Sequence, residues 1–251
     1  MIALSLGWGV QSFTMAAMSA LGELPRVDVA IHADTTHERQ ATYEFAERWA
    51  RWLIERDVDV AMVSAPEKDI ELGTGKVVDI PAFTVSNNGD GQVRRQCTSD
   101  WKIAPIRRYL QAHRDGSPVE LWIGISTDEA LRMKESDVKY ITHRWPLIEK
   151  RMSRNDCAAW LKAHNLEVPP KSSCVFCPYH NSAAWREMWK ENGADWRKSV
   201  EIDNQIRKAR PPYDLFVHPA RKPLEEIDLR NDVDRGQLSL WDEECEGMCG
   251  L

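Results

Sequence analysis

The first 64 residues alternate between short apolar runs and helix-like segments, and this alternation constrains the fold more than any other feature. Residues 2–6, 27–33 and 58–64 read as short buried strands. Residues 10–21 and 36–56 lie between them and carry apolar side chains at helical spacing. Strands that alternate with helices predict a parallel sheet with helices on its faces. We therefore expect an α/β fold with a Rossmann-like open parallel sheet.

The rest of the chain is less regular. Residues 66–96 lack periodicity and read as a long loop, residues 119–125 read as a further strand, and residues 155–164 read as a helix. Two more helices are expected between residues 183 and 209, and the charged sequence after residue 220 lacks a core pattern. We therefore predict a nucleotide-binding α/β domain (1–150), a helical cysteine-bearing region packed on it (151–220) and an extended C-terminal tail (221–251).

Composition narrows the possible functions. The 251 residues have a formal net charge of −6, which argues against broad, non-specific nucleic-acid binding but leaves room for a local basic groove. No apolar run reaches the length of a membrane span, and the N-terminus lacks a signal-peptide pattern. We therefore expect a cytoplasmic protein without a membrane partner. In that compartment the six cysteines point to metal ligands or redox groups rather than structural disulfides.

The sequence S-L-G-W-G-V-Q-S lies between the first predicted strand and the first predicted helix. Backbone N–H groups at a helix start are unpaired and favour an anion, and glycines let the backbone approach it closely. The serine hydroxyls add donors. The alternative is an ordinary tight turn between strand and helix. The candidate nucleotide contacts in this loop are Ser5, Gly7, Gly9, Gln11 and Ser12.

Polar residues also follow two later predicted strands. Asp34 and Thr35 come at the end of the second strand, where an acidic side chain can hold ribose hydroxyls or Mg²⁺. Both would also serve as helix N-caps. Gly124 and Ser126 follow the strand at 119–125, and Arg132 comes shortly after with a guanidinium suited to bidentate binding of phosphate or sulfate. These five residues complete the predicted nucleotide-binding set.

The spacing of Cys174 and Cys177 is that of a metal-ligand or redox pair. Zinc, a [4Fe-4S] cluster and a redox disulfide all use C-x-x-C, so the spacing alone leaves these alternatives open.

Five stretches together resemble the PP-loop superfamily, and within it the branch of the phosphoadenosine phosphosulfate (PAPS) and adenosine phosphosulfate (APS) reductases. They occur in the order that this family shows. They are S-L-G-W-G-V-Q-S, the segment H-A-D-T-T-H-E at 32–38, C-T-S-D-W-K-I-A-P at 97–105, S-R-N-D-C-A-A-W-L at 153–161 and C-V-F-C at 174–177. The resemblance implies an adenine nucleotide (APS, PAPS or ATP) as ligand.

The iron-sulfur branch of that family uses two adjacent cysteines and a C-x-x-C to hold a [4Fe-4S] cluster. Here Thr98 replaces the second of the adjacent cysteines. The resemblance therefore implies Cys97, Cys157, Cys174 and Cys177 as ligands, with Cys157 filling the fourth place. The alternative is that Cys157 is a buried core residue, which would leave an open iron and favour sulfur transfer. Lys102 matches the family lysine that points toward cluster and substrate.

The chain ends in Cys249-Gly250-Leu251, which resembles the C-terminal motif of the sulfonucleotide reductases. In those enzymes the cysteine attacks the sulfur of the sulfonucleotide. The resemblance implies Cys249 as nucleophile, although the histidine that follows in the family motif is absent. Cys245 is a second tail cysteine, suited to a reversible disulfide or to metal binding.

Three functions remain open from the sequence. The first is a sulfonucleotide reductase that uses a thiol reductant such as thioredoxin. The second is an ATP pyrophosphatase and sulfurtransferase that uses Mg²⁺ with ATP and thiolates a nucleic acid or a small molecule. The third is a non-catalytic zinc-binding protein. The sequence leaves the oligomeric state open, a homo-oligomer included.

Overall fold

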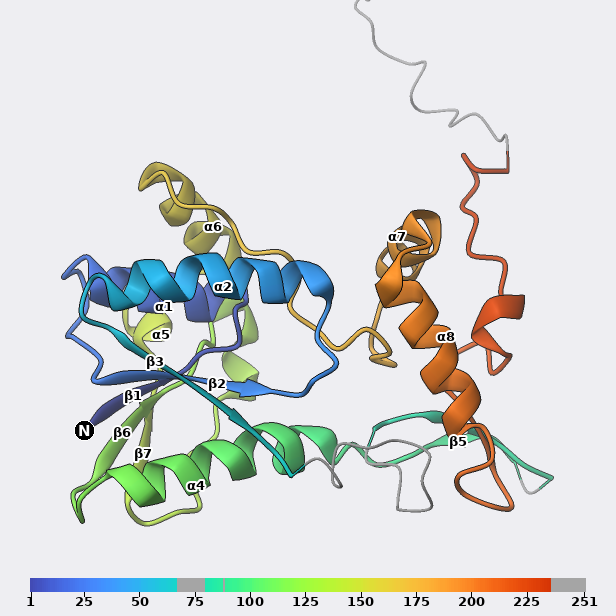
Figure 1. Cartoon of the computed structure of the whole chain (residues 1–251), viewed down its shortest axis with the longest axis horizontal. Helices are drawn as coiled ribbons and strands as arrows, with labels where there is room; N and C mark the ends of the chain where they lie inside the picture. The colour runs from blue at the N-terminus through green and yellow to red at the C-terminus, as the bar shows by residue number, and fades with distance from the viewer. Residues whose placement is uncertain (67–79, 88, 236–251) are drawn as a thin grey trace, which may run out of the picture.

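The computed structural model describes residues 1–66, 80–87 and 89–235. A five-stranded, entirely parallel sheet dominates the N-terminal lobe, with the strand order β3-β2-β1-β6-β7. Figure 1 shows this sheet with helices above and below it. The predicted α/β class with an open parallel sheet is confirmed. The strands are β1 (Ile2–Ser5), β2 (Val29–Asp34), β3 (Asp59–Ser64), β6 (Val119–Trp122) and β7 (Ile141–Arg144).

Two hydrophobic cores cover the two faces of this sheet. On one face, Leu4 and Trp122 pack with Phe13 and Phe45 from the covering helices. On the other face, Ile31 packs with residues of a single helix and its neighbouring strands. The first face carries α1 (Val10–Ala20), α2 (Gln40–Ile54), α5 (Pro146–Glu149) and α6 (Arg154–Ala163), and the second carries α4 (Ala104–His113). No described helix is long and apolar enough to span a bilayer.

The strand order places a ligand site at the centre of the sheet. From β1 the chain continues to β2 on one side, whereas β6 pairs with β1 on the other side. In open parallel sheets, ligands bind outside the carboxyl ends of the strands where the order reverses in this way. The loops that follow β1 and β6 meet at this position.

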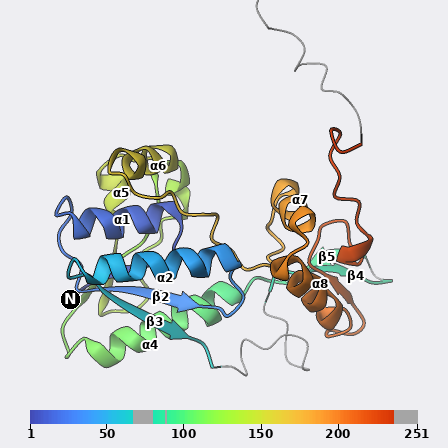
Figure 2. The same cartoon turned by 45° about the horizontal axis from the view of Figure 1, so that its top comes forward.

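A second lobe stands beside the first, as Figure 2 shows most clearly. Its antiparallel sheet has the order β5-β4-β8, and its core includes the buried side chains of Trp185 and Val217. The elements are β4 (Phe83–Val85), β5 (Gly91–Gln92), the π-helix η1 (Thr98–Ile103) that leads back to α4, α7 (Ser182–Glu191), α8 (Ala194–Ile206) and β8 (Asp214–Phe216).

The lobes do not follow the predicted division at residue 150. The hairpin of β4 and β5 belongs to the second lobe, because β4 pairs with β8. Conversely, α6 packs on α1 in the first lobe. The predicted tail also begins later than residue 221, because Leu224 and Leu229 are buried in the second core. Strands of two and three residues carry too little periodicity to reveal this long-range pairing.

The lobes are tied together just before α2. The helix was expected from residue 36 but begins at Gln40, since Thr36 has a left-handed φ of 59° and the following residues pair with the segment around Cys174. The Arg39 guanidinium lies among carboxylates of α7 and α8: 3.2 Å from Glu187, 3.5 Å from Glu191 and 3.5 Å from Asp195. This cluster, which we call the Arg39 clamp, fixes the second lobe against the carboxyl end of β2.

Candidate functional site

A cavity of about 560 Å³ opens at the carboxyl ends of β1 and β6, and we call it the loop cavity. Its walls come from the loop after β1, from the segment after β6, and from residues 154 and 171–172 further along the chain. The predicted contacts that line it are Ser5, Gly7, Gly9, Gln11, Ser12, Gly124 and Arg132; the other lining residues are Ile123, Glu129, Arg154, Lys171 and Ser172.

The loop after β1 is held open by its own hydrogen bonds. The Gly7 N–H donates to Ser12 Oγ at 3.2 Å, and that hydroxyl donates to the Gly9 carbonyl at 3.2 Å. Trp8, between the two glycines, has a left-handed φ of 53°, and its buried ring packs near Phe13. The buried Trp8 ring therefore anchors the loop in the core, whereas Gly7 and Gly9 on either side of it line the cavity.

Gln11 lies at the centre of a polar network on the cavity wall. Its Nε2 donates to Ser126 Oγ at 3.3 Å and to Glu129 Oε2 at 3.3 Å. Its Oε1 accepts from Arg154 Nη1 at 3.0 Å, and Arg132 donates to Glu129 at 2.7 Å. Ser126 is buried and does not line the cavity, so it orients Gln11 instead.

The cavity carries a positive charge. Its lining includes three cations, Arg132, Arg154 and Lys171, against the single carboxylate of Glu129. Such an excess favours phosphate or sulfate, and guanidinium groups bind both in bidentate fashion. Sequence reasoning missed Arg154, Lys171 and Ser172 as contacts. Arg154 lies in the S-R-N-D-C-A-A-W-L stretch, and Lys171 and Ser172 lie two to three residues before Cys174. Their proximity to these motifs was the available signal.

Asp34 and Thr35 are engaged elsewhere and do not line the loop cavity. The Asp34 carboxylate accepts from the Thr36 N–H and from the Tyr43 hydroxyl, each at 2.8 Å. Burial, reinforced by the Asp34 carboxylate, raises the pKa of Tyr43. Thr35 is fully buried, and its Oγ1 lies 3.3 Å from Cys174 Sγ. Neither residue is the predicted helix N-cap, because α2 begins at Gln40 with Arg39 in the N-cap position. Asp34 instead accepts a hydrogen bond within the turn at Thr36, and Thr35 belongs to the surroundings of the C-x-x-C.

The C-x-x-C segment pairs with the residues that directly precede Arg39. Glu38 and Cys174 form an antiparallel bridge, and the Glu38 carboxylate accepts from Lys102 Nζ at 2.9 Å. Burial, with a further contribution from Glu38, raises the pKa of the Cys174 thiol to about 12. Burial also raises the pKa of Cys177, with Cys97 among its charged neighbours. Cys97, Cys174 and Cys177 are all half-buried around Lys102.

Cys157 is not brought together with these three cysteines. It lies in the core between α6 and α1, fully buried, and this burial raises its pKa to about 11. Its charged neighbours are Asp156, Asp128 and Arg154 rather than other cysteines. The spacing within α6 turns the side chain toward the core, which is the alternative that the sequence left open. Among the described residues, no three His, Cys, Asp or Glu side chains converge as a metal site, so the predicted four-cysteine set is not formed.

Comparisons with known proteins give a likeness to solved structures. No protein-family model matches the sequence, and no curated protein matches it. A solved structure of PAPS reductase from Candida auris, in complex with phosphate, is similar over 67% of this chain and 74% of that chain. The identity is 12% and the TM-score is 0.43. The family therefore remains a resemblance carried by the sequence motifs.

One short segment joins the loop cavity to the cysteines. Lys171 and Ser172 line the cavity, and the Ser172 hydroxyl donates to the Gly7 carbonyl at 2.5 Å. Cys174 follows two residues later and contacts Thr35. A positively charged cavity and a group of thiols thus lie on one short segment of backbone. Cys245 and Cys249, the predicted tail cysteines, lie outside the described residues.

Proposed function

We propose that this chain is an enzyme of sulfur chemistry that binds the anionic end of an adenine nucleotide in the loop cavity. The observation that carries the proposal is the segment 171–177, which lines that cavity at one end and bears Cys174 and Cys177 at the other. The first candidate activity is sulfonucleotide reduction. Arg132, Arg154 and Lys171 supply the charge that a phosphate–sulfate anhydride needs.

In this reaction the Cys249 thiolate attacks the sulfur of APS or PAPS. The S–O bond to the phosphate breaks, AMP or adenosine 3′,5′-bisphosphate leaves, and the SO3⁻ group stays on the Cys249 sulfur as an S-sulfonate. A thiol reductant of the thioredoxin type then attacks the Cys249 sulfur, releases sulfite and forms a mixed disulfide. The cationic side chains stabilise the negative charge of the leaving phosphate. Lys102, near Cys97 and Cys174, adds a positive charge beside the thiols.

The second candidate is ATP-dependent sulfur transfer, and the position of Cys157 in the core favours it. Without Cys157, the family resemblance leaves Cys97, Cys174 and Cys177 as candidate ligands, although these side chains do not converge as a metal site among the described residues. A [4Fe-4S] cluster held by three cysteines would leave one iron open to sulfur. An oxygen of the acceptor attacks the α-phosphorus of Mg²⁺-bound ATP and pyrophosphate leaves. A sulfur nucleophile then displaces AMP from the acceptor. The acceptor is a nucleic acid or a small molecule.

One set of measurements separates these candidates. The protein is purified without oxygen, iron and sulfide are quantified, and APS, PAPS and Mg²⁺-ATP are offered separately. Sulfite from APS or PAPS that is lost in Cys249→Ser and kept in the matched Cys245→Ser supports the reductase. AMP and pyrophosphate from ATP without sulfite support sulfur transfer. A colourless zinc protein that turns over none of the three nucleotides would contradict both.

A further inference from the structure

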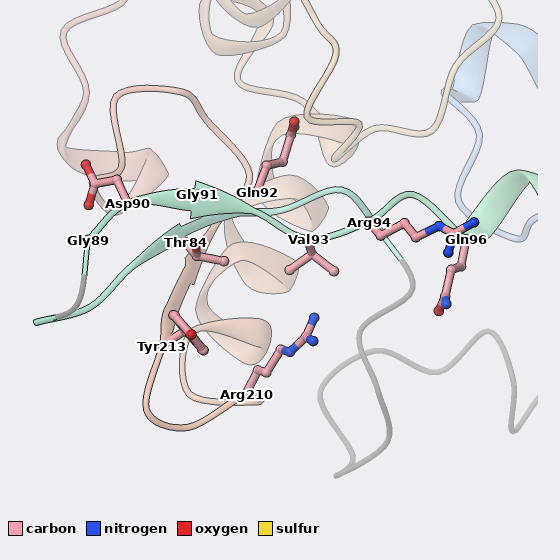
Figure 3. A pocket seen from close by; sticks show the side chains of 10 residues that line it. All are labelled: Thr84, Gly89, Asp90, Gly91, Gln92, Val93, Arg94, Gln96, Arg210 and Tyr213. Atoms are coloured by element: carbon pink, nitrogen blue, oxygen red, sulfur yellow. The ribbon is translucent and has the colours of Figure 1, made fainter.

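A second cavity, of about 540 Å³, lies under the β4–β5 hairpin of the second lobe, and we call it the hairpin cavity. Figure 3 shows that its walls come from two segments far apart in the sequence. Val93, Arg94 and Gln96 lie on the segment that follows β5, whereas Arg210 and Tyr213 lie on the loop between α8 and β8. The nucleotide site proposed above uses none of these residues.

The hairpin cavity is positively charged. Arg94 and Arg210 are both exposed, and neither has an acidic partner within the part of the chain that the structure describes. Asp90 is the single acidic residue in the lining, and its carboxylate lies 3.6 Å from the Arg221 guanidinium. Because Arg221 balances Asp90, the two free guanidinium groups set the charge that a ligand meets.

Aromatic rings accompany these cations. Tyr213 lines the hairpin cavity itself. Next to Arg94 along the chain, the Arg95 guanidinium lies 5.5 Å from the centre of the Tyr179 ring. Tyr179 is 53% exposed, so about half of its surface is open to solvent. Arginines and tyrosines therefore occur together at two neighbouring places on the second lobe.

Both places adjoin the candidate sulfur site. Gln96 lines the hairpin cavity, and the next residue is Cys97. Tyr179 comes two residues after Cys177, and Arg95 is among the charges that act on the Cys177 thiol. A ligand held by these side chains would therefore lie next to Cys97 and Cys177 along the chain.

We propose that the hairpin cavity and the adjoining Arg95–Tyr179 pair bind a short single-stranded segment of nucleic acid. This inference rests on the second candidate function, in which a nucleic acid accepts sulfur. Guanidinium groups bind the phosphates, and tyrosine rings stack on bases that are not paired, a combination that tolerates any sequence. A single strand of nucleic acid carries a phosphate and a base at each nucleotide, which matches the arginines and tyrosines that occur together on this surface. An acidic peptide would satisfy the arginines but leave the rings unused.

The test is fluorescence anisotropy with labelled single-stranded DNA and RNA of about 12 nucleotides, a length within the range of single-strand sites. The salt dependence of binding is measured for the wild type and for the double variant Arg94→Gln/Arg210→Gln. We expect the variant to bind about tenfold more weakly or worse, with a log–log salt slope smaller by about 1.4, since each phosphate contact on a single strand contributes about 0.7. Tyr179→Ala should weaken binding by about tenfold, and Tyr179→Phe should retain it, since only the ring is required.

Arg48→Gln is the matched control, because Arg48 is an exposed arginine of α2 that pairs with Glu167. The proposal is overturned if no oligonucleotide binds, or if Arg48→Gln weakens binding as much as the double variant. It is also overturned if AMP or an acidic peptide of equal charge displaces the oligonucleotide at the same concentration. ATP and APS binding is measured on the same samples. Binding of ATP or APS without binding of oligonucleotide would contradict this inference alone. Binding of oligonucleotide without binding of ATP or APS would contradict the proposed nucleotide site alone.

Discussion

The ammonium of Lys102 lies 2.9 Å from the carboxylate of Glu38, and the two side chains differ sharply in exposure. The Glu38 side chain is 1% exposed, whereas that of Lys102 is 38% exposed. Burial alone would lower the pKa of Lys102, but the charge of Glu38, followed by that of Cys174, raises it overall. The pair therefore joins a buried anion to a cation that still reaches solvent beside the cysteines.

This asymmetry predicts unequal effects of the two neutral substitutions. Lys102→Met leaves the buried Glu38 carboxylate without its cation, so we expect a loss of about 3 kcal/mol in the free energy of unfolding. Glu38→Gln leaves a lysine that can hydrate, so we expect a loss of only about 1 kcal/mol. Urea denaturation at pH 7 measures both. Glu44→Gln, an exposed residue bonded to Gln40, is the control and should be neutral. Equal losses for the two variants would contradict this assignment.

The fold was predictable where the sequence had regular periodicity. The two helices of the first 64 residues are long and periodic and alternate with apolar strands of four to six residues, and these elements lie where the sequence predicts them to within a few residues. The second lobe was not predictable, because β4, β5 and β8 have two or three residues each and become strands only through pairing across the chain. The start of α2 was missed because tertiary contacts of residues 37–39 override local helix propensity.

The candidate site was partly predictable for a similar reason. Glycines and serines after a strand predict an anion loop, and Ser5, Gly7, Gly9 and Ser12 do line the cavity. Arg154 and Lys171 come from distant segments, and although both lie near recognised motifs, no local pattern encodes how the fold brings them to the loop after β1. Cys157 shows the converse case. Cysteine is a common metal ligand, but Cys157 lies on the inner face of α6 and is therefore surrounded by the core.

Cys157→Ala tests that position directly. If the core role is correct, the variant keeps the iron and sulfide content of the wild type and loses about 1 kcal/mol of unfolding free energy from the missing sulfur atom. Cys177→Ala is the matched comparison, and it should lose iron if a cluster is bound. Both contents are measured by colorimetric assay after purification without oxygen. A loss of iron in Cys157→Ala would restore the four-cysteine interpretation.

His32 predicts a dependence of stability on pH. Burial lowers its pKa from the usual value of 6.5, although a hydrogen bond with the Leu6 carbonyl at 3.1 Å acts in the opposite direction. Below about pH 6.5 the unfolded chain binds a proton that the folded chain does not, so stability falls as pH decreases. His32→Gln should lose less stability between pH 7 and pH 5 than the wild type. An equal change in stability for His32→Gln and the wild type would refute the assignment.

Gly124→Ala tests the contact between the loops after β1 and β6. A Cβ at this position would lie 3.0 Å from the backbone nitrogen of Ser12 and 3.2 Å from its Cα, so the start of α1 must shift. We expect a loss of about 1–3 kcal/mol in the free energy of unfolding and weaker binding of nucleotide. Gly193→Ala is the control, since a Cβ there meets no atom within 4 Å. Calorimetric titration with ATP and APS measures the affinity, and unchanged binding in Gly124→Ala would exclude this contact from the nucleotide site.

The Arg39 clamp predicts that the two lobes unfold together only while the clamp is intact. The Arg39 side chain is 10% exposed and faces Glu187, Glu191 and Asp195, so Arg39→Met removes the cation from a cluster of three carboxylates. We expect a loss of about 3 kcal/mol in the free energy of unfolding and a denaturation curve that separates into two transitions, because the second lobe then loses this charged contact with the first.

Arg48→Met is the control, since it removes an arginine that is 55% exposed and pairs with Glu167. It should lower the free energy of unfolding by less than about 1 kcal/mol and keep one transition. Urea denaturation followed separately by tryptophan fluorescence and by circular dichroism distinguishes one transition from two. A single, unshifted transition in Arg39→Met would mean that the apolar contacts between the lobes, rather than the clamp, couple them.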